Sequence, residues 1–200
     1  MTLLLEPNAR LSPSPDIFDA VRDADCNLAI WQRECVPGAE ELASEELGEI
    51  RFSATLDTLE ARLATELDAA GYPAGSTLDA LTANILDLAQ RFAAMMELDG
   101  VQVRLGIVTT NSCRKFHADY VKARLITTYT GTGTQWIDAE DAARVAKGEE
   151  PQAIHTLNAG DVGLFKGKMW TQSPAIHRSP PIADAGERRL LLVLDPPLKD

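Results

Sequence analysis

The apolar residues of this chain change their spacing near residue 100. In the longest run before that point they stand at Leu78, Leu81, Ile85, Leu88, Phe92 and Met95. This three- and four-residue period predicts an amphipathic helix that Ser76 caps and Asp99-Gly100 ends. Leucines recurring every four residues from Leu59 predict a shorter helix over 57–71.

The rest of the first half has weaker patterns. Short helices are expected over 16–24 and 39–49, and short strands over 27–31 and 51–55. The first fifteen residues contain three prolines and little periodicity, so they are predicted to form a loose arm. Residues 1–100 are thus expected to be mainly helical.

After Gly100 the apolar residues alternate with others, as at Val101, Val103, Leu105 and Ile107, which predicts a strand with one buried face. Further strands are expected over 121–129, 135–137, 153–157, 162–166, 175–178 and 188–194, with one inserted helix over 139–147. Many short strands joined by polar turns predict a small antiparallel barrel or jelly roll over 101–200. The fold class is therefore α+β, with the helices of 1–100 packed on this barrel in one compact unit.

Charge is distributed unevenly along the chain. Residues 1–100 carry 19 acidic and 6 basic side chains (net −13), and residues 101–200 carry 11 acidic and 13 basic ones (net +2). A total of −11 argues against nucleic acid as the main partner, and the second half is the better host for a small anion. No leader or membrane span is recognised, so a cytoplasmic protein without a membrane partner is expected. Three cysteines without a CxxC pair predict no disulfide framework.

The candidate chemistry lies in the second half. His117 and Asp119 are two residues apart, so they share one side of an extended segment, and His177 lies on a later strand. Two histidines and one carboxylate are the ligand set that holds Fe(II) while leaving positions open. A lone histidine is more often structural than a ligand, and His155, which has no partner motif, is interpreted as structural or exposed.

The order of motifs resembles a known superfamily. His117-Ala118-Asp119, the strand over 124–129, the Gly160-Asp161 turn, His177 and the arginines at 188 and 189 resemble the double-stranded β-helix of Fe(II)/2-oxoglutarate oxygenases, a jelly-roll, cupin-like fold. Segments 27–33, 113–120, 128–134 and 177–181 further resemble a bacterial family known as domain of unknown function 1826.

The superfamily resemblance implies Fe(II) and 2-oxoglutarate as cofactors and a hydroxylase or demethylase reaction on an unknown small molecule or peptide. A guanidinium on the last strand would bind the distal carboxylate of 2-oxoglutarate. Arg189 and Arg188 are the candidates; alternation does not choose between them, and Arg189 is preferred. Tyr129 or Thr127 could add a hydroxyl contact from the neighbouring strand.

Two other hypotheses stay open at this point. Cys113 precedes His117 by four residues, and as a fourth ligand it would shift the preference toward zinc, giving a zinc-binding cupin-like protein connected with metal homeostasis. Alternatively the barrel has no chemistry and serves as an interaction module. The sequence specifies neither the substrate nor the oligomeric state.

Overall fold

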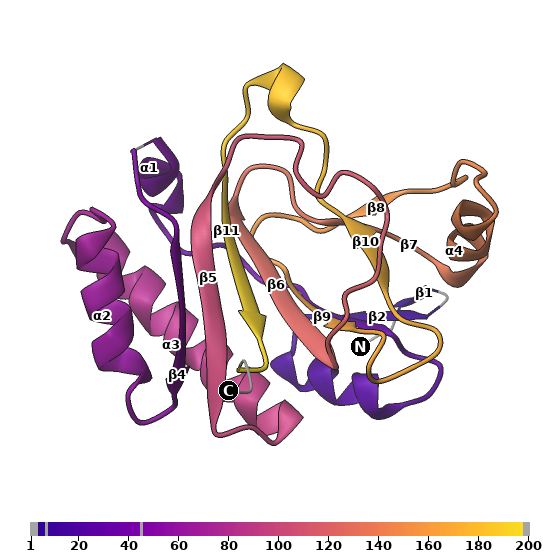
Figure 1. Cartoon of the computed structure of the whole chain (residues 1–200), viewed down its shortest axis with the longest axis horizontal. Helices are drawn as coiled ribbons and strands as arrows, with labels where there is room; N and C mark the ends of the chain where they lie inside the picture. Colours follow the sequence, from indigo (N-terminus) through magenta and orange to yellow (C-terminus); the bar gives the residue numbers. More distant parts are fainter. Residues whose placement is uncertain (1–3, 7, 45, 198–200) are drawn as a thin grey trace.

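The computed structural model describes residues 4–6, 8–44 and 46–197 and has the α+β architecture that the sequence predicts (Figure 1). Its large sheet has eight strands in the order β1-β2-β3-β9-β6-β11-β5-β4. Their bounds are β1 Leu4–Glu6, β2 Ala9–Ser12, β3 Leu28–Trp31, β4 Ile50–Thr55, β5 Gly100–Val108, β6 Ala123–Thr130, β9 Val162–Lys166 and β11 Arg189–Asp195. Neighbouring strands are antiparallel except for the parallel pair β2 and β3.

A smaller sheet faces the inner strands of the large one. It contains β10 (Ile176–Arg178), β7 (Gln135–Ile137) and β8 (His155–Thr156), in that order. An isolated antiparallel bridge between His117 and His177 adds the segment around His117 to the free edge of β10. Opposite lie β9, β6, β11 and β5 (Figure 1). The second half is thus a double-stranded β-helix, as predicted.

Strand alternation divides the apolar residues between two cores. On β11, Leu190, Leu192 and Leu194 belong to the core between the large sheet and the helices. Leu191 and Val193, on the opposite side of the same strand, belong to the core between the two sheets. A residue's position in this alternation therefore decides whether it faces the helices or the interior of the barrel.

Helices cover the outer face of the large sheet. They are η1 (Pro15–Arg22, a 3-10 helix), α1 (Ala39–Ser44), α2 (Leu59–Ala69) and α3 (Ser76–Met96), while α4 (Ala139–Ala146) and η2 (Ala183–Ala185) lie in loops of the second half. The α3 stripe packs into the outer core as expected. This helix ends at Glu97, which has a left-handed backbone (φ +55°), and Gly75 rather than Ser76 precedes its first turn. The first acidic helix is shorter than predicted and ends at residue 44.

The prediction of a loose N-terminal arm is wrong for residues 4–6 and 9–12. β2 forms a parallel ladder with β3, with Ala9 opposite Leu28, and β1 pairs with β2. This pairing depends on a strand distant in sequence, so local periodicity could not reveal it. Residues 1–100 also add β3 beside β9 and β4 beside β5, so one sheet joins both halves.

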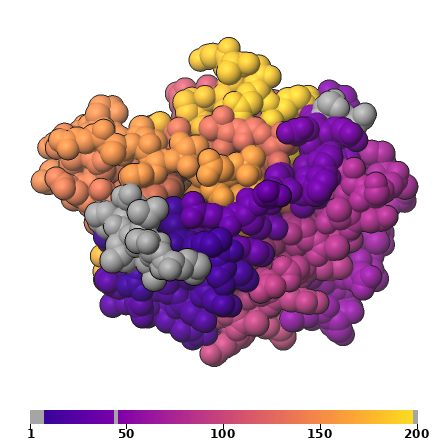
Figure 2. All heavy atoms as spheres, turned by 180° about the vertical axis from the view of Figure 1, so that it is seen from behind, coloured from indigo at the N-terminus to yellow at the C-terminus, as the bar shows by residue number. Residues whose placement is uncertain are grey.

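The space-filling view from behind is consistent with this union. In Figure 2 the indigo and purple residues of the N-terminal half lie directly against orange residues of the second half. Within the described ranges, no helix is long and apolar enough to cross a bilayer.

Candidate metal centre

The two candidate histidines are placed by their own main chains. The N–H of His117 donates to the carbonyl of His177, and the N–H of His177 donates to the carbonyl of His117, each at 2.9 Å. Residues paired in this way across an antiparallel bridge direct their side chains to the same face. The ring centroids are 4.8 Å apart, and the His177 ring also packs on Phe165 at 4.7 Å.

A main-chain carbonyl lies beside Nδ1 of each ring. Nδ1 of His117 lies 2.8 Å from the carbonyl oxygen of Lys115, and Nδ1 of His177 lies 3.4 Å from that of Ala175. A carbonyl only accepts, so in a hydrogen bond at this place Nδ1 is the donor. In the neutral ring, Nε2 then presents a lone pair, which is the form that binds a metal.

Asp119 completes the group. Its Oδ2 lies 3.2 Å from Nε2 of His177 and its Oδ1 lies 3.8 Å from Nε2 of His117, and one ligand atom from each residue falls within 4.8 Å of the others. Oδ2 is buried and makes no hydrogen bond within the described residues. A divalent cation at this point would satisfy all three lone pairs.

An ion would draw the triad inward. Two atoms bonded to one ion at about 2.1 Å lie at most about 4.2 Å apart. The side chain of His117 is 36% exposed, whereas those of Asp119 and His177 are 11% and 5% exposed. His117 is therefore the ligand with room to move, and the other two form the fixed side of the centre.

Arg124 orients the carboxylate ligand. Its NH1 donates to Oδ1 of Asp119 at 2.6 Å, while Nε and NH2 hold both oxygens of Asp195 at 2.7 and 2.8 Å. Burial alone would raise the pKa of Asp119, but nearby His177 and the Arg124 guanidinium outweigh it and lower that pKa. The ligand is thus held ionised, with Oδ2 directed away from Arg124.

Arg189 is a buried cation without a carboxylate partner among the described residues. Its NH1 donates to Ser179 Oγ at 3.3 Å and its NH2 to Thr128 Oγ1 at 3.2 Å, while its buried Nε makes no hydrogen bond. Burial lowers the pKa of Arg189 to about 10, only partly opposed by the charge of Glu187. The Glu187 carboxylate is engaged by the N–H and hydroxyl of Thr132. An uncompensated guanidinium in this position is suited to bind an anion.

The structure places the other residues proposed for an anion site outside it. Arg188 points toward the helices, where its Nε donates to the carbonyl of Ala43 at 2.6 Å. Tyr129 also faces the helices, and its hydroxyl donates to Asn84 on α3 at 2.9 Å. Alternation on β6 puts Thr127 on that same outer side, so Thr128 is the threonine that contacts Arg189. The pattern alone could not distinguish inward from outward positions, so it left Arg188, Tyr129 and Thr127 among the candidates.

Cys113 is near the centre but is not a ligand in this geometry. It lines the same cavity of about 50 Å³ as His117 and His177, yet its sulfur is not part of the group that could share an ion. Its backbone is left-handed (φ +56°), and its carbonyl accepts the N–H of Ser179 at 3.1 Å. His155 stacks on Trp136 at 4.2 Å and likewise does not join the group.

Sequence reasoning misses the supporting residues of the site. The sequence predicts for Arg124, a basic residue near the mouth of the proposed barrel, either a surface charge or a contact with an acidic substrate. It gives no indication for Asp195, Thr128 or Ser179. The signal for Arg124 is weak because its second partner, Asp195, is 71 residues away. Only strand alternation, which puts Arg124 on the same face of β6 as Ile126 and Thr128, could have indicated that it faces inward.

This chain belongs to the family described as "Protein of unknown function (DUF1826)", whose model matches residues 12–195. A search of curated proteins finds no match.

Three solved structures are similar to the chain. AviO1 from Streptomyces viridochromogenes Tue57 shares 15% identity over 92% of this chain and 96% of its own (TM-score 0.42). A prolyl-4-hydroxylase from Pseudomonas putida shares 13% over 84% and 99% (TM-score 0.38). HygX from Streptomyces hygroscopicus, solved with nickel and 2-oxoglutarate bound, shares 11% over 76% and 83% (TM-score 0.33). At these values none of them determines what this chain binds or catalyses.

Proposed function

We propose that this protein is an Fe(II)- and 2-oxoglutarate-dependent oxygenase, a hydroxylase or demethylase of an organic substrate. One observation carries the proposal. A His-Asp-His group with converging lone pairs lies in the same barrel interior as a buried guanidinium that lacks a carboxylate partner among the described residues. Ser179 connects them, because it contacts Arg189 and also lines the cavity of the triad.

Each side chain has a definite task in this proposal. His117, Asp119 and His177 would hold the ion from one side and leave its remaining positions open. Arg189, with the hydroxyls of Ser179 and Thr128, would bind the distal carboxylate of 2-oxoglutarate. When bound, Fe(II) and 2-oxoglutarate would, with dioxygen as the oxidant, supply the chemistry for C–H hydroxylation; one oxygen atom would enter the substrate and the other succinate, with release of carbon dioxide.

The surrounding residues support this chemistry in two ways. Apolar side chains of Ile126, Leu191 and Val193 line the triad cavity and limit the access of water. Arg124 keeps Asp119 ionised and oriented, as partners of metal-binding carboxylates commonly do. The zinc alternative with Cys113 as a fourth ligand gains no support, because its sulfur lies outside the group.

The test is turnover of the cosubstrate. The protein is loaded with Fe(II) in the absence of oxygen and is then exposed to air and to 2-oxoglutarate labelled at its C1 carboxyl carbon. The release of labelled carbon dioxide and the formation of succinate are measured. We expect slow substrate-independent turnover that disappears in His177→Ala. His155→Ala is the matched control, because it removes an imidazole of the same barrel that stands outside the triad. Tight retention of zinc, with no turnover after iron loading, would refute the proposal.

A further inference from the structure

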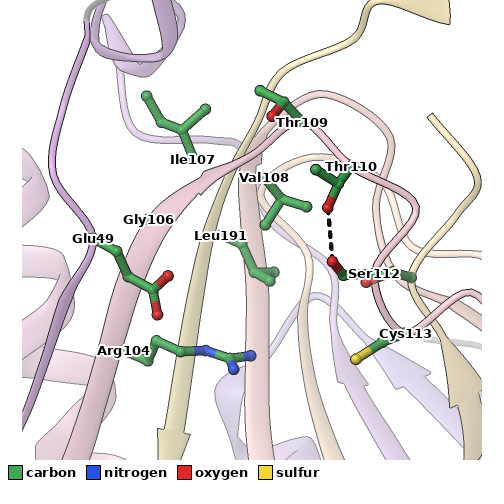
Figure 3. A pocket seen from close by; sticks show the side chains of 11 residues that line it. Glu49, Arg104, Gly106, Ile107, Val108, Thr109, Thr110, Ser112, Cys113 and Leu191 are labelled. Atoms are coloured by element: carbon green, nitrogen blue, oxygen red, sulfur yellow. Dashed lines mark hydrogen bonds between the residues drawn. The ribbon is translucent and has the colours of Figure 1, made fainter. Parts of the chain in front are cut away.

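A cleft of about 280 Å³, shown in Figure 3, lies next to the cavity of the triad, with which it shares lining residues. Its walls come from β5, β11 and the loop that follows β5, and they include Arg104, Val108, Cys113 and Leu191. Arg104, Cys113, Ser179 and Leu191 line both this cleft and the cavity of the triad. The two spaces are therefore neighbours that share these four residues as part of their walls.

The guanidinium of Arg104 is available to bind a ligand in the cleft. Among the described residues its guanidinium has neither a hydrogen bond nor an ion pair, whereas Arg124 is held by two carboxylates. Glu49 lies in the same cleft, but within the described ranges no ion pair joins it to Arg104 (Figure 3). Arg104 is half-buried and stands opposite Val193 of β11. A partly desolvated guanidinium of this kind favours a carboxylate or phosphate as its partner.

The other walls fit a small molecule with an apolar body. Val108 and Leu191 supply an apolar surface, and the hydroxyls of Thr110 and Ser112, 2.7 Å apart, lie across from it (Figure 3). The space depends on Gly106, because a Cβ there would stand 3.0 Å from Cγ of Glu49. Mixed apolar and polar walls around one available charge are typical of a site that binds and orients a ligand.

We propose that this cleft is the substrate site and that the substrate carries a carboxylate or phosphate group bound by Arg104; this rests on the proposed oxygenase function. The two arginines then have separate tasks. Arg189 is fully buried and reaches the interior, where the cosubstrate would bind. Arg104 lies in the cleft that leads to the surface, so it can hold the anionic end of a substrate while the adjoining carbon faces the triad.

The charge of the cleft can be tested without metal or turnover, because Cys113 is an exposed thiol within it. The rate at which Cys113 is modified is measured with two reagents, the anionic sulfonatoethyl and the cationic trimethylammonioethyl methanethiosulfonate. Mass spectrometry distinguishes modification of Cys113 from modification of Cys26 and Cys35. Loss of one unit charge at short range in a partly screened site should lower the anionic-to-cationic rate ratio about fivefold in Arg104→Gln. Lys147→Gln, which removes the same charge beside α4, should leave the ratio unchanged.

Binding is tested on the Fe(II)-loaded protein, kept without oxygen and saturated with 2-oxoglutarate. Alkylation of Cys113 by neutral iodoacetamide is followed while succinate, inorganic phosphate or uncharged succinamide is added. We expect protection by succinate, by phosphate or by both, which distinguishes the two anion classes, and none by succinamide. Arg104→Gln should require at least about fivefold more anion for equal protection, which corresponds to the loss of one charge-assisted contact.

Two results would overturn the proposal. One is an unchanged rate ratio together with unchanged anion protection in Arg104→Gln. The other is loss of 2-oxoglutarate binding in Arg104→Gln but not in Arg189→Gln, since Arg104 would then hold the cosubstrate. Neither result depends on turnover, so failure of the substrate proposal and failure of the oxygenase proposal are distinguishable.

Discussion

Replacement of Arg189 by methionine tests whether this residue is kept for a ligand rather than for stability. Burial lowers the pKa of Arg189 from its usual value to about 10, which corresponds to about 3 kcal/mol by which folding disfavours the charged side chain. Both values lie far above neutrality, so the guanidinium is charged in the folded and unfolded chain at pH 7. The whole penalty is therefore present there and is relieved only as pH rises through about 10.

Arg189→Met removes this penalty and keeps an unbranched side chain that can fill the same space. The variant loses two hydrogen bonds to Ser179 and Thr128, each contributing about 1 kcal/mol. We therefore expect the metal-free variant to match the wild-type free energy of unfolding or to exceed it by up to about 2 kcal/mol. Most buried arginines would give the opposite sign, because their removal strands a carboxylate.

The assay is chemical denaturation at pH 7 with and without Fe(II) and 2-oxoglutarate, in the absence of oxygen. At a hundred times its dissociation constant, 2-oxoglutarate should raise the wild-type free energy of unfolding by about 2.7 kcal/mol, and it should have little effect on Arg189→Met. Arg188→Met is the matched control: it should lose about 1 kcal/mol with its bond to Ala43 and respond fully to the ligand. If Arg189→Met lost more than about 2 kcal/mol and still gained the wild-type increment from 2-oxoglutarate, the reasoning would be refuted.

Three further predictions concern the support of the centre. Arg124→Leu leaves Asp119 and Asp195 without their cation, so it should destabilise the metal-free protein by about 2 kcal/mol and weaken Fe(II) binding about 10- to 100-fold. Chemical denaturation measures the first effect and anaerobic titration the second. Unchanged affinity would show that Arg124 does not position Asp119. The lowered pKa of Asp119 means that its ionised form adds stability at neutral pH, and this stability is lost as the pH falls through the lowered pKa. Metal-free Asp119→Asn should therefore lose less free energy of unfolding on acidification than the wild type, and an identical slope would count against this. Gly167→Ala should reduce the free energy of unfolding by about 1–3 kcal/mol, because the added Cβ would collide with the carbonyl oxygen of Val121. It should also weaken metal binding, because the N–H of the following residue, Lys168, donates to the carbonyl of Asp119. Wild-type stability and affinity would contradict this prediction.

The features that sequence could predict are those set by local period. The α3 stripe and the alternation of β5 each depend on neighbouring residues, and both elements form where they were expected. The spacing of His117 and Asp119 is local too. The structure brings both beside His177, although no periodicity links that residue to them.

The features that sequence could not predict depend on partners distant in the chain. Alternation puts Arg188 and Arg189 on opposite faces, but the pattern does not tell which face is inward. In the structure Arg189 alternates in unbroken register with Leu191 and Val193 of the inner core and lies beside Thr128. The same limit applies to Arg124, whose role depends on Asp195 on the last strand. β2 likewise exists because β3 lies beside it.

The reciprocal main-chain bridge between His117 and His177 has a consequence for the order of events in the cell. Between these residues the chain must complete β6, β7, α4, β8 and β9 before β10 returns to the first histidine. A chain still emerging from the ribosome would therefore hold two of the three proposed ligands, and the third only once β10 has been made. If the centre binds a metal as proposed, loading would be a late step that requires the nearly finished barrel.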